Sequence, residues 1–64
     1  MKIKPSDIKL KSLVKFINDD GEWNITSINL DKRTLWAIST NSPRKTHQPM
    51  SKIVKLDRKP VEVE

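Results

Sequence analysis

Apolar residues alternate with lysine near the start of the chain, and this period of two limits the fold more than any other feature of the sequence. In this stretch Ile8, Leu10, Val14 and Phe16 fall on even positions and the lysines fall on odd ones. Successive side chains of a strand point to opposite faces, so the pattern predicts a strand with one face in the core and the other in water. Leu13 interrupts the alternation, as expected where a strand bends into a curved sheet.

Two further strands are predicted after a turn. Asn18-Asp19-Asp20-Gly21 is a cluster of turn-forming residues that contains the only glycine of the chain, and glycine takes positive φ at low cost. We therefore expect a hairpin at this cluster. Segments 23–29 and 34–39 are rich in β-branched and aromatic residues, which favours a second and a third strand.

The next segment, residues 40–50, contains two prolines and no periodicity. It is predicted to be a loop that returns through a turn at Pro49-Met50-Ser51. A short last strand is expected over residues 53–56, and no helix is predicted.

The register of the second hairpin depends on its loop. A four-residue loop over residues 30–33 pairs Ile25 with Ile38 and places Trp23 and Trp36 on one apolar face, whereas a three-residue loop separates the two tryptophans. A slip of one residue moves a strand's whole apolar set to the other face, so burial should select between the two registers. We favour the four-residue loop. The predicted core is then Val14, Phe16, Ile25, Ile38 and Ile53.

The chain is 64 residues long and has no cysteine, so packing alone must hold one small domain. Folding at this length buries only about 60% of the surface that the unfolded chain exposes. We expect the single domain 1–64 to have its ordered part over about 8–57, with flexible ends at 1–7 and 58–64. No stretch near the start is apolar enough for a signal peptide or a membrane span, so we expect a cytoplasmic protein without a membrane partner.

These strands and the turn before the last one resemble the small SH3-like barrels, including the KOW and Tudor-like modules, from Leu10 to Leu56. Residues 10–16 stand where those barrels often have apolar, x, Gly, x, Val, x, apolar, and Gly21 followed by Ile25 and Ile28 is similar to the KOW strand. Ser12 replaces the usual glycine. Three aromatic residues are too few for a methyl-lysine cage. The resemblance implies an all-β fold, a five-stranded antiparallel barrel, that serves as a binding platform for nucleic acid or protein.

Charge is sorted along the chain. Residues 18–31 contain four acids and no base, whereas residues 32–59 contain eight bases and one acid. A basic surface favours a polyanionic partner, DNA or RNA, because lysine and arginine displace the counterions of phosphates. We expect the basic residues of the second hairpin loop and of the 40–50 loop to converge as a phosphate clamp. The predicted nucleic-acid-binding residues are Lys32, Arg33, Arg44, Lys45 and Lys52.

The sequence leaves alternatives open at two places, a basic turn and the tryptophans. Ser42-Pro43-Arg44-Lys45 resembles the Ser-Pro-basic-basic turns that lie in narrow minor grooves, and it equally fits a kinase site or a plain β-turn. The tryptophans are expected in the core, although an exposed tryptophan stacks on bases.

A protein-interaction or inhibitory module is the alternative function, of the kind that small viral or mobile-element genes often encode. It would dock through apolar residues that so small a barrel leaves outside, namely Ile28, Leu30 and Leu35. Its partner would be an acidic protein, and the chain itself would be a monomer or a weak dimer.

An enzyme is not expected. The sequence has no nucleophile with a base, no paired carboxylates in an apolar setting and no phosphate loop. His47 is the only histidine, and the acids around Gly21 lack the spacing of a calcium loop. We therefore expect no metal and no cofactor.

Overall fold

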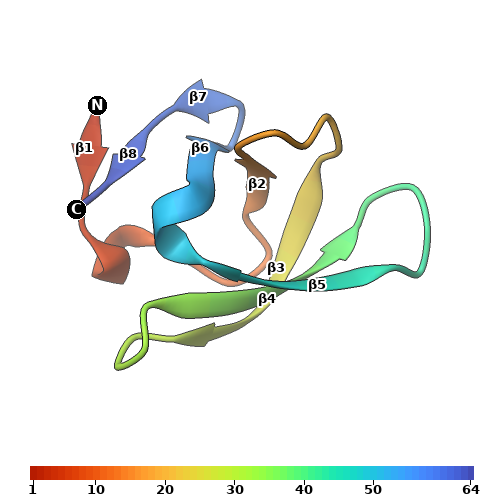
Figure 1. The fold of residues 1–64 in the computed structure, drawn as a ribbon, viewed down its shortest axis with the longest axis horizontal. Helices are drawn as coiled ribbons and strands as arrows, with labels where there is room; N and C mark the ends of the chain where they lie inside the picture. Colours follow the sequence, from red (N-terminus) through yellow and green to blue (C-terminus); the bar gives the residue numbers. More distant parts are fainter.

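The computed structural model describes residues 1–64 and is all-β, with eight strands, two 3-10 turns and no α-helix (Figure 1). The all-β prediction is thus confirmed. The 3-10 turns are η1 (Pro5–Asp7) and η2 (Met50–Lys52). The strands are β1 (Lys2–Ile3), β2 (Leu13–Phe16), β3 (Trp23–Asn29), β4 (Thr34–Ser39), β5 (Lys45–Pro49), β6 (Ile53–Leu56), β7 (Lys59–Pro60) and β8 (Glu62–Val63).

Six of these strands form one antiparallel sheet in the order β5-β4-β3-β2-β6-β7. The sheet does not close into a barrel, because β5 and β7 stand at its two edges. The sequential hairpins β3-β4 and β4-β5 supply one half of the sheet, and β6 joins the other half by pairing with β2 (Figure 1).

Strand β5 lies inside the segment that the sequence predicted to be a loop. Its prolines are compatible with a strand because of where they stand: Pro43 precedes the strand, and Pro49 is the last residue of an edge strand. A proline at an edge removes no hydrogen bond that the sheet needs. The turn expected at Pro49-Met50-Ser51 is present as η2, one residue further along.

The β3-β4 hairpin has the four-residue loop, and Ser27 pairs with Trp36 as predicted. A register shift between Ile25 and Ser27 leaves Thr26 as an extra residue, so Ile25 lies opposite Ala37 and not opposite Ile38. A bulge of this kind places two consecutive residues on the same side of the strand. The faces of β4 are therefore the reverse of those predicted.

The core contains nine buried residues, and the prediction was right for four of its five members. Ile38 is the wrong one, since the bulge turns it outward and leaves it half-buried. The buried residues that sequence reasoning missed are Leu35 and Ala37 of β4 and Met50 of η2. The buried residues are Ile8, Val14, Phe16, Trp23, Ile25, Leu35, Ala37, Met50 and Ile53.

The two ends of the chain, which the sequence placed outside the barrel as flexible tails, lie side by side (Figure 1). Strand β1 pairs with β8 in parallel, with Lys2 opposite Glu62 and Ile3 opposite Val63. Ile3, Val61 and Val63 pack against the core.

Candidate functional site

The predicted phosphate clamp does not form, because its two halves lie at opposite ends of β4. Lys32 and Arg33 are in the β3-β4 loop, whereas Arg44 and Lys45 are at the β4-β5 connection (Figure 1). Consecutive hairpins that share a strand have their loops at opposite ends of that strand. The expected convergence of the four residues is therefore wrong.

Arg33 and Lys52 have structural contacts. The Arg33 Nη1 group donates a hydrogen bond to the Glu64 carbonyl oxygen at 3.3 Å, and the Arg33 carbonyl accepts one from the Met50 N–H at 2.8 Å. The Lys52 carbonyl accepts a hydrogen bond from the Ile17 N–H at 2.8 Å. Arg33 thus connects the hairpin tip to the C-terminus.

The Ser-Pro-basic-basic segment forms a compact loop. The Arg44 N–H donates to the Ser42 Oγ at 3.4 Å, and the Arg44 carbonyl accepts from the Ser39 N–H at 2.8 Å. These contacts close the β4-β5 connection and leave the Arg44 and Lys45 residues exposed.

Trp36 lies on the outer face of the sheet, although the sequence placed it in the core. It alternates with the buried Leu35 and Ala37, and 47% of its surface is exposed. Its cross-strand partner on β5 is His47. The two rings are stacked, with centroids 4.8 Å apart and planes at 26°. An aromatic pair therefore stands in contact with solvent at the middle of β4 and β5.

Polar groups surround the aromatic pair. A groove of about 210 Å³ runs beside it, between the hairpin tip and β5. The Asn29 Oδ1 accepts a hydrogen bond from the Lys32 N–H at 3.1 Å, which orders the loop that carries Lys32 at the end of this groove. The groove is lined by Ser27, Asn29, Lys32, Thr34, Leu35, Trp36 and His47.

A second cation lies on the same face. Lys45 is two residues before His47 on β5 and lies opposite Ile38, which is itself two residues after Trp36. The outer face of β3, β4 and β5 thus presents two stacked rings, hydroxyl and amide groups, and a lysine on either side. We call this surface the aromatic face. It can stack on a planar group, hydrogen-bond to its edge and attract an anion.

Sequence reasoning missed the aromatic face although one signal was available. The predicted register already placed Ser27 opposite Trp36, and directly opposed residues share a face of the sheet. A serine at that position indicates a solvent-facing pair.

Trp23, in contrast, is part of the core. It is 9% exposed, and its Nε1 group donates to the Asp19 Oδ2 at 3.1 Å. The Asp19 Oδ1 accepts from the Gly21 N–H at 2.8 Å, so this acid has a structural role. Gly21 does not adopt positive φ. A Cβ there would lie 3.3 Å from the Asp19 Oδ1, which is a tight contact with the acid that accepts from Trp23, and 3.5 Å from the Trp23 Nε1, which is an ordinary contact.

The apolar docking patch predicted for the alternative function is not exposed as a unit. Leu35 is 1% exposed, which corrects its expected position outside the barrel. The bulge at Thr26 is the reason. The four-residue loop pairs Leu35 with Ile28, and the bulge brings this pair to the same face as the buried Ile25. Ile28 packs against the core, and only Leu30, in the loop, is 53% exposed.

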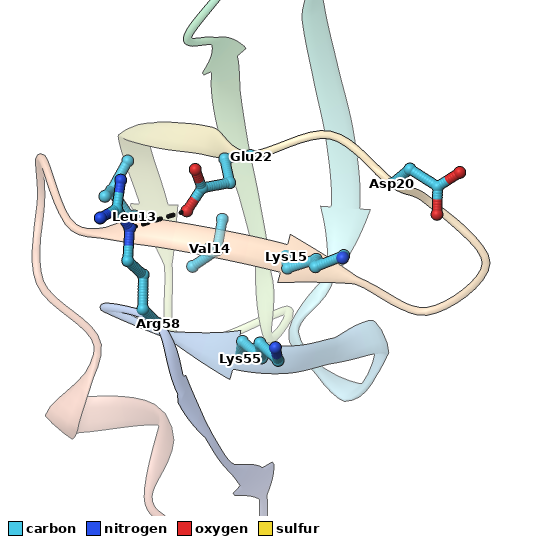
Figure 2. A pocket seen from close by; sticks show the side chains of 7 residues that line it. All are labelled: Leu13, Val14, Lys15, Asp20, Glu22, Lys55 and Arg58. Carbon is cyan, nitrogen blue, oxygen red and sulfur yellow. Dashed lines mark hydrogen bonds and ion pairs between the residues drawn. The ribbon is translucent and has the colours of Figure 1, made fainter.

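A second hollow, of about 340 Å³, opens between β2, β6 and the segment before β3 (Figure 2). The Arg58 Nε group and the Glu22 Oε2 form an ion pair of 3.3 Å at its rim. Lys15 and Lys55 also line the hollow, and they lie directly opposite each other on neighbouring strands.

No group of three or more His, Asp or Glu side chains is placed to hold a metal ion. No helix is long and apolar enough to cross a membrane. Comparisons of the chain with protein-family models, with curated proteins and with solved structures found no match.

Proposed function

We propose that this chain is a non-enzymatic nucleic-acid-binding module and that its aromatic face holds single-stranded DNA or RNA. The observation that carries the proposal is the exposed position of Trp36, stacked on His47 in the middle of a sheet face. Burial of an aromatic side chain is a large source of stability in a small domain. A tryptophan that stays 47% exposed forgoes much of that stability and offers its ring to a ligand.

The chemistry of the face favours a single strand over a duplex. Bases stack on aromatic side chains only when they are not already stacked within a helix, and such stacking is worth about 1 to 3 kcal/mol per base. The Ser27 hydroxyl, the Asn29 amide and the Thr34 hydroxyl lie beside the rings and can bond to base edges. Lys32 and Lys45 stand at either side for the phosphates.

The fold supports a binding platform. The strand order β5-β4-β3-β2-β6, with the 3-10 turn η2 between β5 and β6, resembles the order in SH3-like barrels. We infer that the sheet is an open form of such a barrel. The net charge of +5 also favours a polyanionic ligand.

Titration of the tryptophan fluorescence with short single-stranded oligonucleotides tests the proposal. Binding should quench the fluorescence of Trp36. Trp36→Ala should weaken the affinity about 5- to 150-fold, which corresponds to the loss of one base stack. Leu30→Ala is the matched control, because Leu30 is a large exposed residue of the adjacent loop that cannot stack. No binding to any single strand at 50 mM salt, or an equal loss in both variants, would contradict the proposal.

A further inference from the structure

Two lysines face each other across the β2-β6 pairing, beside the larger hollow of the molecule. Lys15 is directly opposite Lys55, and both line the hollow of about 340 Å³. Figure 2 shows the two side chains projecting from neighbouring strands on the same side of the sheet. The aromatic face contains neither residue.

This pair is electrostatically unfavourable without a ligand. Directly opposed residues of antiparallel strands have Cβ atoms about 4.5 to 5.5 Å apart, and like charges at that position destabilise the sheet. Neither lysine forms an ion pair. The salt bridge in this region joins Arg58 to Glu22. An anion that accepts hydrogen bonds from both ammonium groups would replace the repulsion by attraction.

The acids beside the hollow do not neutralise the lysines. The Glu22 Oε2 is 3.3 Å from the Arg58 Nε and is thereby paired. Asp20 lies on the loop after β2, and Figure 2 shows its carboxylate away from both lysines. The pairing also shifts register next to Lys15, which leaves Val54 as an extra residue and bends β6 beside the pair.

We propose that Lys15 and Lys55 form an anion site for a phosphate group, with Arg58 at its rim. A phosphate has several acceptor oxygens, and each lysine ammonium group has three donors, so one anion can bond to both. The site takes either a free phosphate or phosphoryl group or a phosphate of a nucleic-acid backbone, because the recognising chemistry is the same. It stands independently of the function proposed for the aromatic face.

Thermal unfolding in phosphate and in chloride at matched ionic strength tests the site. In chloride, Lys55→Gln should raise the melting temperature by about 1 to 8 °C, because the repulsion is removed. Phosphate should raise the melting temperature of the natural chain, by about 6 °C or more once it exceeds its dissociation constant tenfold. The increase should be smaller in Lys55→Gln. Lys9→Gln is the control, since it removes the same charge from an exposed residue outside the hollow.

Phosphate also stabilises proteins in general by exclusion from their surface. An equal increase in the natural chain, Lys55→Gln and Lys9→Gln would therefore overturn the proposal. Saturable shifts of the backbone amide resonances of Lys15, Val54 and Lys55 on phosphate addition would support it. Oligonucleotide affinity of the Lys15→Gln/Lys55→Gln variant then identifies the source of the anion. Unchanged affinity assigns the site to free phosphate or a phosphoryl group, and reduced affinity assigns it to the nucleic-acid backbone.

Discussion

At the scale of single residues, the two tryptophans differ in their contacts and in their exposure to solvent. The Trp23 indole N–H donates to Asp19 from within the core, so both its ring and its polar group are accommodated by the protein. Trp36 has its ring against His47 and half its surface in solvent. The difference follows from Thr26, the extra residue of β3, because the bulge decides which residues of β4 face inward.

Truncation of β4 side chains should follow this observed orientation. Leu35→Ala should lower the free energy of unfolding by about 2 to 5 kcal/mol, because it leaves a cavity in the core. Ile38→Ala should cost clearly less, because Ile38 is half-buried on the outer face. Urea unfolding of both variants, with Ile25→Ala as a core reference, measures the difference. A larger loss for Ile38→Ala would mean that β4 has the opposite orientation.

At the scale of elements, local sequence patterns predict β2, β3 and β4, whereas tertiary contacts determine β5. Strand β2 follows from the apolar and lysine positions around Val14, and β3 and β4 follow from their β-branched residues. Strand β5 has no such pattern and is ordered by pairing with β4. The bulge likewise has no local signal. The size and type of Trp36 favour the core, and only Ser27, opposite it in the predicted register, indicates the aromatic face.

Removal of the C-terminal element should destabilise the fold. Truncation after Pro60 deletes residues 61–64, which include β8, and so breaks the pairing with β1. It also removes Val61 and Val63, which pack against the core. Two partly buried valines are worth about 2 kcal/mol in total. Urea unfolding should show this loss for the truncated chain and almost none for Glu62→Ala, since Glu62 is exposed. Equal stability of the full and truncated chains would mean that the end behaves as a free tail.

At the scale of the whole molecule, the basic residues are dispersed and do not form one clamp. The loops that carry Lys32 and Arg44 lie at opposite ends of β4, and Lys15 and Lys55 belong to β2 and β6. The net charge of +5 therefore attracts anions in general. Any one bound ligand, however, contacts only a few of the basic residues.

This dispersal predicts a weak salt dependence of single-strand binding. With Lys32 and Lys45 as the phosphate contacts, the log-log slope should be about −1.4, which corresponds to roughly a sevenfold loss of affinity between 50 and 200 mM salt. A four-residue clamp on duplex DNA would give about −3.6. Lys32→Ala should reduce the slope by about 0.7, whereas Arg44→Ala should leave it unchanged, because Arg44 lies in the β4-β5 loop outside the aromatic face. A steeper slope that returns to about −1.4 in the Lys15→Gln/Lys55→Gln variant would assign the additional contacts to the β2-β6 site. A steep slope that Arg44→Ala flattens would instead contradict the placement of the ligand on the aromatic face.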